Sequence, residues 1–285
     1  MGDRHDHAPG ARAIKWHIDW IRRPLVGAIL VAIVLLALFK GPVFFAALFV
    51  LMVLPASYEW HRMVDKGHFR LEAAVTASAV IIALGFLLFG TGSNIAWIVL
   101  LGGVGVSLIV SGLRETNALW QSAGVMYLGI PTLAMVSLYM FTAHGPWVLI
   151  GLYVSVWATD TGALIFGNLI GGPKLAPVLS PNKTWAGTLG GVAVSAIAQT
   201  IYIGVLGGSV WAAAVFGAGL AVVAHAGDLF ESWSKRQFHV KDSGSLIPGH
   251  GGILDRVDST LAAGTVLAFL VLVLGLDPLF GGAPL

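Results

Sequence analysis

Long apolar segments recur along this chain, and they constrain its fold more than any other feature. Runs of roughly 20 apolar residues are long enough to cross the ~30 Å hydrocarbon core of a bilayer as helices. Only 11% of the residues are charged, whereas a soluble domain carries about 25%. We therefore predict an all-α polytopic membrane protein with about nine transmembrane helices. The apolar segments are 25–39, 42–57, 71–90, 94–113, 122–141, 146–166, 185–206, 210–227 and 259–276.

The first two apolar segments are short and are separated only by Lys40-Gly41-Pro42. They form either two tilted spans or one broken re-entrant element, and in both cases the chain returns to the same face. Ahead of them, we expect residues 1–24 to be a cytoplasmic or interfacial segment, because aromatic and aliphatic residues alternate there with basic ones. Residues 1–12 are equally compatible with a disordered tail. The integral membrane domain then comprises residues 25–285, and no cleaved signal peptide is expected.

The positive charges predict the orientation of the spans. With nine spans, alternate connections share a side, and fifteen of the sixteen Lys and Arg residues fall on the side of the N-terminus. The other side holds only Lys40. Cytoplasmic loops of membrane proteins carry an excess of Lys and Arg. We therefore expect the N-terminus and the long connections at 167–184 and 228–258 to be cytoplasmic.

Composition also narrows the class of protein. The chain has no cysteine, which excludes disulfides, thiol catalysis and Cys-type zinc sites. The net charge is only +2, so we expect no nucleic-acid partner. A transporter is disfavoured because no internal repeat is visible and the charges gather in loops rather than at the middle of the membrane. Gly187 and Gly191 are spaced for close helix packing, and such glycine-rich faces permit a homodimer without requiring one.

The connection at 167–184 is too long for a simple turn, and long ordered loops are often functional. Ser180, Lys183 and Thr184 precede an apolar segment, where a helix N-terminus would offer free N–H groups to phosphate. A plain helix cap by Ser or Asn, with Lys183 extended to the interface, explains the same residues. Asp160 lies inside the preceding span, where a carboxylate costs about 2.5–3.5 kcal/mol. It is either a site residue or a structural partner of neighbouring polar groups.

The connection at 228–258 holds nine of the chain's thirty Lys, Arg, Asp and Glu residues. Asp255 and Asp258 are three residues apart and share a face of the following helix, whereas Arg256 points elsewhere. Aspartates beside basic side chains and a glycine-rich turn are typical of a site for polyphosphate and Mg²⁺. The alternative is an interfacial loop whose charges pair with one another and with lipid head groups. That alternative explains the basic residues better than it explains the aspartates.

A family resemblance is carried by residues 232–258, which read SWSKRQFHVKDSGSLIPGHGGILDRVD. This stretch resembles the signature of the phosphatidate cytidylyltransferases, also called CDP-diacylglycerol synthases. Ser234 stands where the family prefers an apolar residue, and this is a packing position. A second similar block runs from Asp160 to Trp185, with Asn168 and Ala186 departing from the common residues. Tyr58-Glu59-Trp60 also resembles the family.

The resemblance implies a nucleotidyltransferase of the bacterial inner (cytoplasmic) membrane, with its catalytic loops in the cytoplasm. It would join phosphatidate and CTP to give CDP-diacylglycerol and pyrophosphate, with Mg²⁺ as the cofactor and a second cation as a further candidate. Other membrane lipids would surround the protein as partners. The expected catalytic residues are Asp228, Lys235, Arg236, Lys241, Asp242, His250, Asp255 and Arg256. The expected substrate-binding residues are Asp160, Ser180, Lys183, Thr184, Lys235, Arg236, Lys241 and Arg256. The expected metal ligands are Asp228, Asp255 and Asp258.

Overall fold

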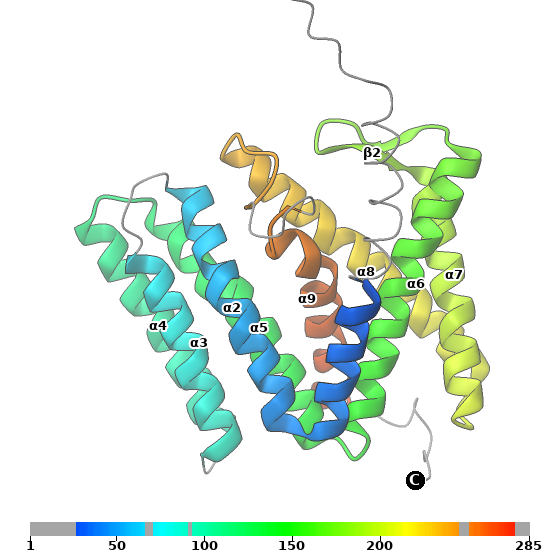
Figure 1. The fold of residues 1–285 in the computed structure, drawn as a ribbon, viewed down its shortest axis with the longest axis horizontal. Coiled ribbons are helices and arrows are strands. Elements are labelled where there is room, and N and C mark those ends of the chain that lie inside the picture. The colour runs from blue at the N-terminus through cyan, green and yellow to red at the C-terminus, as the bar shows by residue number, and fades with distance from the viewer. Residues whose placement is uncertain (1–26, 66–70, 91–92, 245–250, 277–285) are drawn as a thin grey trace, which may run out of the picture.

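The computed structural model describes residues 27–65, 71–90, 93–244 and 251–276. Within these residues, each of the nine predicted apolar segments contains a helix, and eight helices are long and apolar enough to cross a membrane (Figure 1). The prediction of a polytopic helical membrane protein is therefore confirmed. The helices are Gly27–Lys40, α2 (Pro42–Val64), α3 (Leu71–Phe89), α4 (Ser93–Leu113), α5 (Ala118–Phe141), α6 (Gly145–Ile170), α7 (Trp185–Val205), α8 (Val210–Gln237) and α9 (Leu254–Ala268), which continues as the π-helical η1 (Phe269–Val273).

The first two apolar segments form separate helices that run in opposite directions (Figure 1). The helix Gly27–Lys40 ends at Gly41, whose φ of 124° is open to glycine but not to most residues. Pro42 then occupies the first turn of α2, where its missing N–H leaves no bond unmade. The described part of the first helix has 14 residues, or about 21 Å at 1.5 Å per residue. This described part is shorter than a full span, whereas α2 is long enough to be one.

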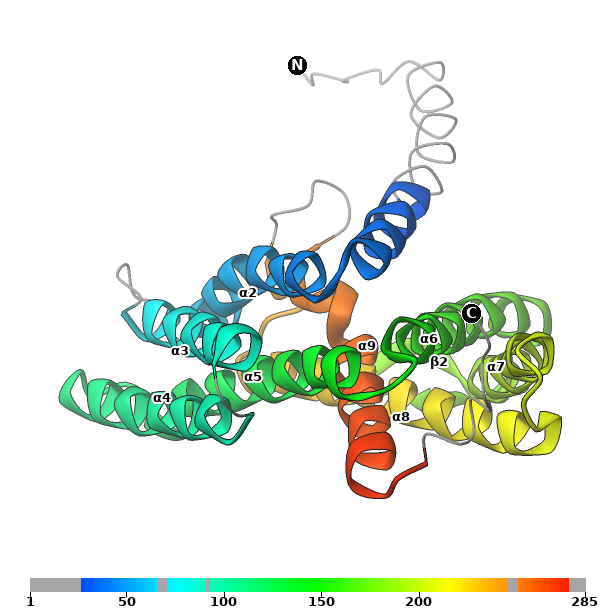
Figure 2. The same ribbon diagram turned by 90° about the horizontal axis from the view of Figure 1, so that it is seen from below.

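The helices form two groups joined by α9. Helices α2 to α5 pack against one another on one side, and α6, α7 and α8 pack together on the other (Figure 2). Helix α9 contacts both groups, because it packs against α8 and α6 as well as α5 and α2. Side chains on the first turns of α9 consequently lie where the two groups meet.

Glycines allow the closest helix contacts, as the sequence predicted. On α7, a methyl group at Gly187 would lie 2.8 Å from the carbonyl oxygen of Ala163 on α6, and one at Gly191 would lie 2.7 Å from that of Thr159. On α8, a methyl group at Gly227 would lie 2.9 Å from the carbonyl oxygen of Asp258. Real Cβ atoms are not found that close to backbone. Gly227 therefore lets α8 approach the part of α9 that carries the aspartates.

Two of the predicted loops are largely regular structure. Helix α8 continues to Gln237, ten residues beyond the predicted end of its apolar segment, so the charged stretch begins on a helix rather than in a loop. Its charges do not break the helix because Glu231 and Lys235 are paired at i,i+4. Likewise α2 runs to Val64 rather than ending near residue 57.

The connection at 167–184 also differs from the prediction. Helix α6 extends to Ile170, and strands β1 (Lys174–Ala176) and β2 (Ser180–Thr184) form an antiparallel hairpin. No strand was expected, because neither segment has the alternating apolar pattern that marks a strand. This hairpin is the one β-sheet among the described residues.

Candidate active site

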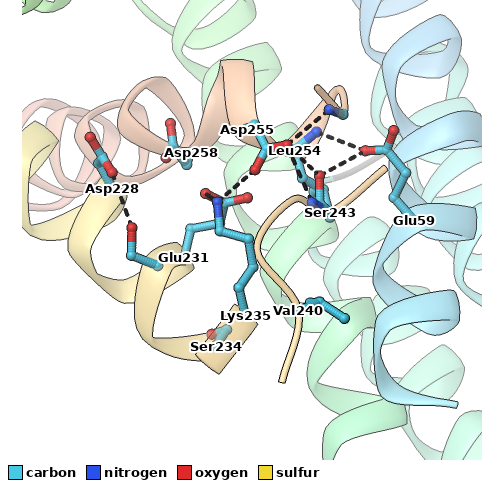
Figure 3. A network of polar contacts seen from close by, with 12 residues as sticks. Glu59, Asp228, Glu231, Ser234, Lys235, Val240, Ser243, Leu254, Asp255 and Asp258 are labelled. Atoms are coloured by element: carbon cyan, nitrogen blue, oxygen red, sulfur yellow. Dashed lines mark hydrogen bonds and ion pairs between the residues drawn. The ribbon is translucent and has the colours of Figure 1, made fainter. Parts of the chain in front are cut away.

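Four carboxylates gather where α8 faces the start of α9 (Figure 3). Asp228 and Glu231 come from α8, and Asp255 and Asp258 come from α9. Glu231 is 2% exposed and Asp258 is 7% exposed. Acidic side chains are rarely buried unless they are paired or bind a cation. This concentration of carboxylates in a membrane domain therefore requires partners.

Lys235 is the central partner of this cluster. Its ammonium lies 2.8 Å from Oε2 of Glu231 and 2.6 Å from Oδ1 of Asp255. The side chains of the three residues are only 3–12% exposed, so water screens these ion pairs weakly. Lys235 thereby joins α8 to α9, two elements that the glycine-rich segment separates in the sequence.

The other carboxylate oxygen of Asp255 is held by the glycine-rich segment. Its Oδ2 accepts from the amide of Gly252 at 2.8 Å and from the hydroxyl and amide of Ser243 at 3.0 and 3.3 Å. Gly251 has a φ of +81°, and a methyl group there would lie 2.9 Å from the same oxygen. The glycine conformation therefore lets the backbone reach Asp255.

Glu59 supports this arrangement from α2. Its carboxylate accepts from the amides of Ile253 and Leu254 at 3.1 and 3.0 Å and from the Ser243 hydroxyl at 3.3 Å. These are amide groups at the start of α9 that have no partner within the helix. Glu59 is 1% exposed, and any side chain at Gly252 would collide with its carboxylate. A residue almost 200 positions away thus fixes the direction in which α9 begins.

The β-hairpin reaches the same site through Lys183. The Lys183 ammonium lies 2.5 Å from Oδ2 of Asp228, and the Ser232 hydroxyl contributes a long bond of 3.5 Å to Oδ1. Thr184 caps α7, since its hydroxyl accepts from the Gly187 amide at 3.1 Å. A helix cap is therefore present, but it is Thr184 rather than the Ser or Asn that the capping interpretation named. The extension of Lys183 to the membrane interface is wrong, because its ammonium turns to α8 instead.

The remaining predicted residues lie around this cluster. Arg236 donates to the carbonyl oxygen of Val240 at 2.8 Å. Lys241 and Asp242 are exposed on the segment that follows α8, and Ser180 begins β2. His250 lies outside the described residues.

Asp255 and Asp258 share a face of α9 as predicted, and the structure turns that face toward α8 (Figure 3). Asp258 accepts from the Ser259 amide at 2.7 Å. Arg256 turns away from that face and, with Asp160 of α6, lines an apolar cavity. Asp160 is ten residues from the end of α6, almost three turns. Ser234 is fully buried and bonds the Phe230 carbonyl at 3.0 Å, which confirms a packing position.

The donor set fits a hard cation that also binds phosphate. Among the described residues, no three acidic or histidine side chains are grouped closely enough to enclose a metal ion. Mg²⁺ is commonly held by one or two carboxylates, with substrate phosphates and water completing its coordination. Within the same residues, Oε1 of Glu231 is buried without a hydrogen-bond partner. The carboxylates also outnumber the two lysines that pair with them.

Three residues of the site were not assigned a role from the sequence: Glu59, Glu231 and Ser243. Glu231 was detectable, because Lys235 follows it by four residues on a helix. Glu59 was harder to identify from the sequence, because its one distinguishing feature is that it is an acidic residue at the end of an apolar segment. Ser243 gave none, since its role depends on where α2 and α9 lie.

The fold and site together define an integral membrane protein with a charged site at the junction of two helix groups. The sequence profile of the Cytidylyltransferase family matches residues 21–274, and the chain belongs to this family. Phosphatidate cytidylyltransferase of Brucella suis biovar 1 is 45% identical over 152 residues, covering 52% of this chain and 55% of that protein. The chain thus spans about half the length of the Brucella relatives it matches. Phosphatidate cytidylyltransferase of Staphylococcus epidermidis is 32% identical over 258 residues, covering 88% of this chain and 98% of that protein.

Proposed function

We propose that this protein transfers the cytidylyl group of CTP to phosphatidate, giving CDP-diacylglycerol and pyrophosphate. One observation carries the proposal. The described parts of the stretch that resembles the family signature, residues 232–244 and 251–258, converge on one charged cluster through the contacts of Lys235 and Asp255. The names of the relatives supply the substrates that such a cluster would handle.

The reaction needs positioning and charge stabilisation more than it needs a base. The attacking group is an oxygen of the lipid phosphate, which is already ionised at neutral pH. It forms a bond to the α-phosphorus of CTP as the bond from that phosphorus to the oxygen bridging to the β-phosphate breaks. Pyrophosphate leaves with the electron pair. Phosphoryl-type transfers of this kind depend on alignment and on electrostatic stabilisation of the phosphate oxygens.

The basic residues around the cluster are suited to bind those phosphates. We assign Lys235, Arg236, Lys241 and Arg256 to the phosphates of CTP and phosphatidate. A second group of phosphate-binding residues lies on the hairpin, next to the start of α7: Ser180, Lys183 and Thr184. Asp242 orients Lys241 or contacts the nucleotide, and His250 either donates to pyrophosphate or stabilises its turn. Asp160, which lies deeper along α6, orients the basic side chains through its negative charge.

Mg²⁺ would be held by Asp228 and Asp255, with Asp258 as a further carboxylate. When bound, the ion would neutralise charge shared by the attacking and leaving oxygens. In the described structure Lys183 and Lys235 pair with these aspartates. The two ammonium groups therefore hold the carboxylates in position and are placed to turn toward phosphate oxygens.

The charge distribution supports a location in the bacterial inner membrane with the site on the cytoplasmic side. The hairpin, the end of α8 and the start of α9 lie at one end of the helices (Figure 1). This is the end to which fifteen of the sixteen Lys and Arg residues were assigned. CTP would then reach the site from the cytoplasm and phosphatidate from the inner leaflet.

A direct assay on detergent-purified protein tests the proposal. Phosphatidate and radiolabelled CTP are supplied with and without Mg²⁺, for wild type and for Asp255→Asn. We expect labelled lipid only from wild type with Mg²⁺. Binding of CTP without turnover on phosphatidate would redirect the search to another phospholipid acceptor. Folded wild type that neither binds nor consumes CTP would overturn the proposed function, and normal turnover by Asp255→Asn would overturn the metal assignment.

A further inference from the structure

An apolar cavity of about 640 Å³ lies between the helix Gly27–Lys40, α2, α6 and α9. This volume falls within the ~300–1,000 Å³ of typical small-ligand sites. Its walls are mostly aliphatic and aromatic, for example Val34, Leu48 and Trp157. Its few polar side chains are Asp160, Thr161, Arg256 and Thr260, with the hydroxyl of Tyr153 as a further polar group.

The charged residues of the cavity gather at the end nearer the active site. Helix α6 runs toward the hairpin, so Asp160 lies closer to that end than Tyr153 does (Figure 1). Helix α9 runs the opposite way, so Arg256 lies closer to it than Leu261 does. Asp160 also interacts electrostatically with Arg256, Lys183 and Asp228. The cavity therefore changes from apolar to charged toward the reacting groups.

The first turn of α9 links the cavity to the site. Asp255 faces Lys235 on α8, whereas the next residue, Arg256, lines the cavity. A ligand whose phosphate lies near Arg256 can therefore extend an apolar tail into the cavity. Its phosphate would stay within reach of the residues that we assign to catalysis.

One wall of the cavity is the helix Gly27–Lys40, whose buried residues lie only toward its C-terminal end. At its far end, Ala37 and Leu38 are buried, and Tyr139 donates to the Leu38 carbonyl at 2.7 Å. Toward the active site, Ile29 and Leu30 are about half exposed. The cavity thus lies behind a helix whose described residues nearest the active site, 27–30, are exposed, and we infer that a lipid chain from the bilayer enters there.

We propose that this cavity holds a hydrocarbon chain of an anionic diacyl phospholipid, with the phosphate near Arg256, and that Leu48 on α2 helps decide which chains fit. The proposal rests on the proposed function, which makes such a lipid the acceptor. It goes further by assigning one acyl chain to a defined cavity in place of the bulk bilayer.

Substrate chain length tests this assignment. Leu48→Trp would place a larger ring in the cavity and narrow it, whereas Leu54→Trp places the same ring on the same helix at a side chain that is 48% exposed and outside the cavity. For Leu48→Trp we expect KM for dioleoyl phosphatidate to rise about tenfold, since losing roughly two buried methylenes has that effect. KM for CTP and turnover of dihexanoyl phosphatidate should stay near wild type. Leu54→Trp should match wild type throughout.

The outcomes separate the two proposals. The cavity assignment would be overturned if Leu48→Trp and Leu54→Trp changed KM for dioleoyl phosphatidate equally. It would also be overturned if Leu48→Trp impaired turnover of both lipids equally. In either case, turnover by wild type would still support the proposed function. Loss of wild-type turnover on both lipids would instead overturn the proposed function.

Photolabelling gives a second readout that needs no turnover. A dioleoyl-length phosphatidate with a diazirine at the end of one chain should label peptides from α2 and α6 in wild type and less in Leu48→Trp. Labelling spread over the outer faces of α3 and α4 would contradict the proposal. Equal labelling by a phosphatidylcholine probe, without competition by phosphatidate, would assign the cavity to bulk lipid and overturn it.

Discussion

Two buried polar clusters in this protein differ in how well their groups are matched. Between α2, α3 and α5, His61 bonds Gln121 through Nδ1 and Thr76 through Nε2, the latter at 2.8 Å. Nearby, Glu72 pairs with Arg114 at 3.3 Å and also accepts from Thr116. In that cluster, both nitrogens of the His61 ring have hydrogen-bond partners, and the Glu72 carboxylate has both an ion pair and a hydrogen bond. We infer that this cluster stabilises the packing of α2 to α5.

The α8–α9 cluster is matched less completely. Four carboxylates meet two lysines there, and Oε1 of Glu231 is buried without a hydrogen-bond partner among the described residues. Buried groups left in this state cost free energy, so a fold alone would not favour them. Burial of charge therefore does not by itself distinguish the two clusters. We infer that the α8–α9 cluster is the functional one, because its acids outnumber its lysines and are held by contacts from several elements.

The largest expected effect follows from removing Lys235. Lys235→Met leaves Glu231 and Asp255 facing each other in a buried setting, which costs about 3–5 kcal/mol of stability. We expect a large fall in the thermal-inactivation midpoint and no detectable cytidylyl transfer.

The double variant Lys235→Met/Glu231→Gln tests whether Lys235 is only structural. It should recover part of the lost stability without recovering activity. Recovery of both would show that the α8–α9 cluster is a structural cluster like the other one.

Glu59 and Glu72 give a matched pair of buried acids, one in each cluster. Glu59→Gln weakens the acceptor for the start of α9, and a lost buried hydrogen bond is worth about 1–3 kcal/mol. We expect kcat to fall roughly 10- to 100-fold with little change in KM for CTP, because Asp255 is misplaced.

Glu72→Gln should lower the inactivation midpoint while kcat stays near wild type. Equal loss of kcat in the two variants would remove the distinction between the clusters. A higher kcat for Glu59→Asp than for Glu59→Gln would further support a role of Glu59 in positioning Asp255.

Two left-handed glycines allow a smaller test. Gly251→Ala adds strain of about 1–2 kcal/mol and presses a methyl group toward Oδ2 of Asp255. Gly41→Ala adds comparable strain, but no atom lies within 4 Å of the new methyl group. Both should lower stability, and only Gly251→Ala should reduce kcat, by about tenfold. If the two variants had the same kcat, the conformation of the glycine-rich segment would not determine the position of the Asp255 carboxylate.

The smallest effect is expected from Thr116→Val. The Thr116 hydroxyl makes long bonds of 3.4 Å to Glu72 and to the Ser111 carbonyl. Their loss should reduce stability by about 1 kcal/mol or less, measured as a small fall in the inactivation midpoint. A change in activity would show that the α2–α5 cluster communicates with the site.

Much of the site was visible in the sequence because its charges interrupt apolar segments. Asp228, Lys235 and Asp255 stood out in that way, and the shared face of Asp255 and Asp258 followed from helical spacing. The end of α8 was misjudged because charged residues were taken to end a membrane helix. Here they are paired within the helix and across to α9, so the helix continues to Gln237.

The role of Glu59 and the apolar cavity could be found only in the folded chain. Glu59 acts on amides 194 and 195 residues away, and no local pattern records such a contact. The cavity is bounded by four helices that come from three separate parts of the chain. Its existence depends on how far the helix Gly27–Lys40 stands from α6 and α9.

The sequence by itself decided that this chain would be a bundle of membrane helices, because apolar segments of that length have few other stable arrangements in a bilayer. It also decided the chemical character of the site through clustered acids, bases and glycines. Only the tertiary structure decided which charges meet, since ion pairs and caps depend on distances of a few ångströms between helices remote in sequence. Those distances are set by packing, by Gly227 between α8 and α9 and by Gly187 and Gly191 between α6 and α7.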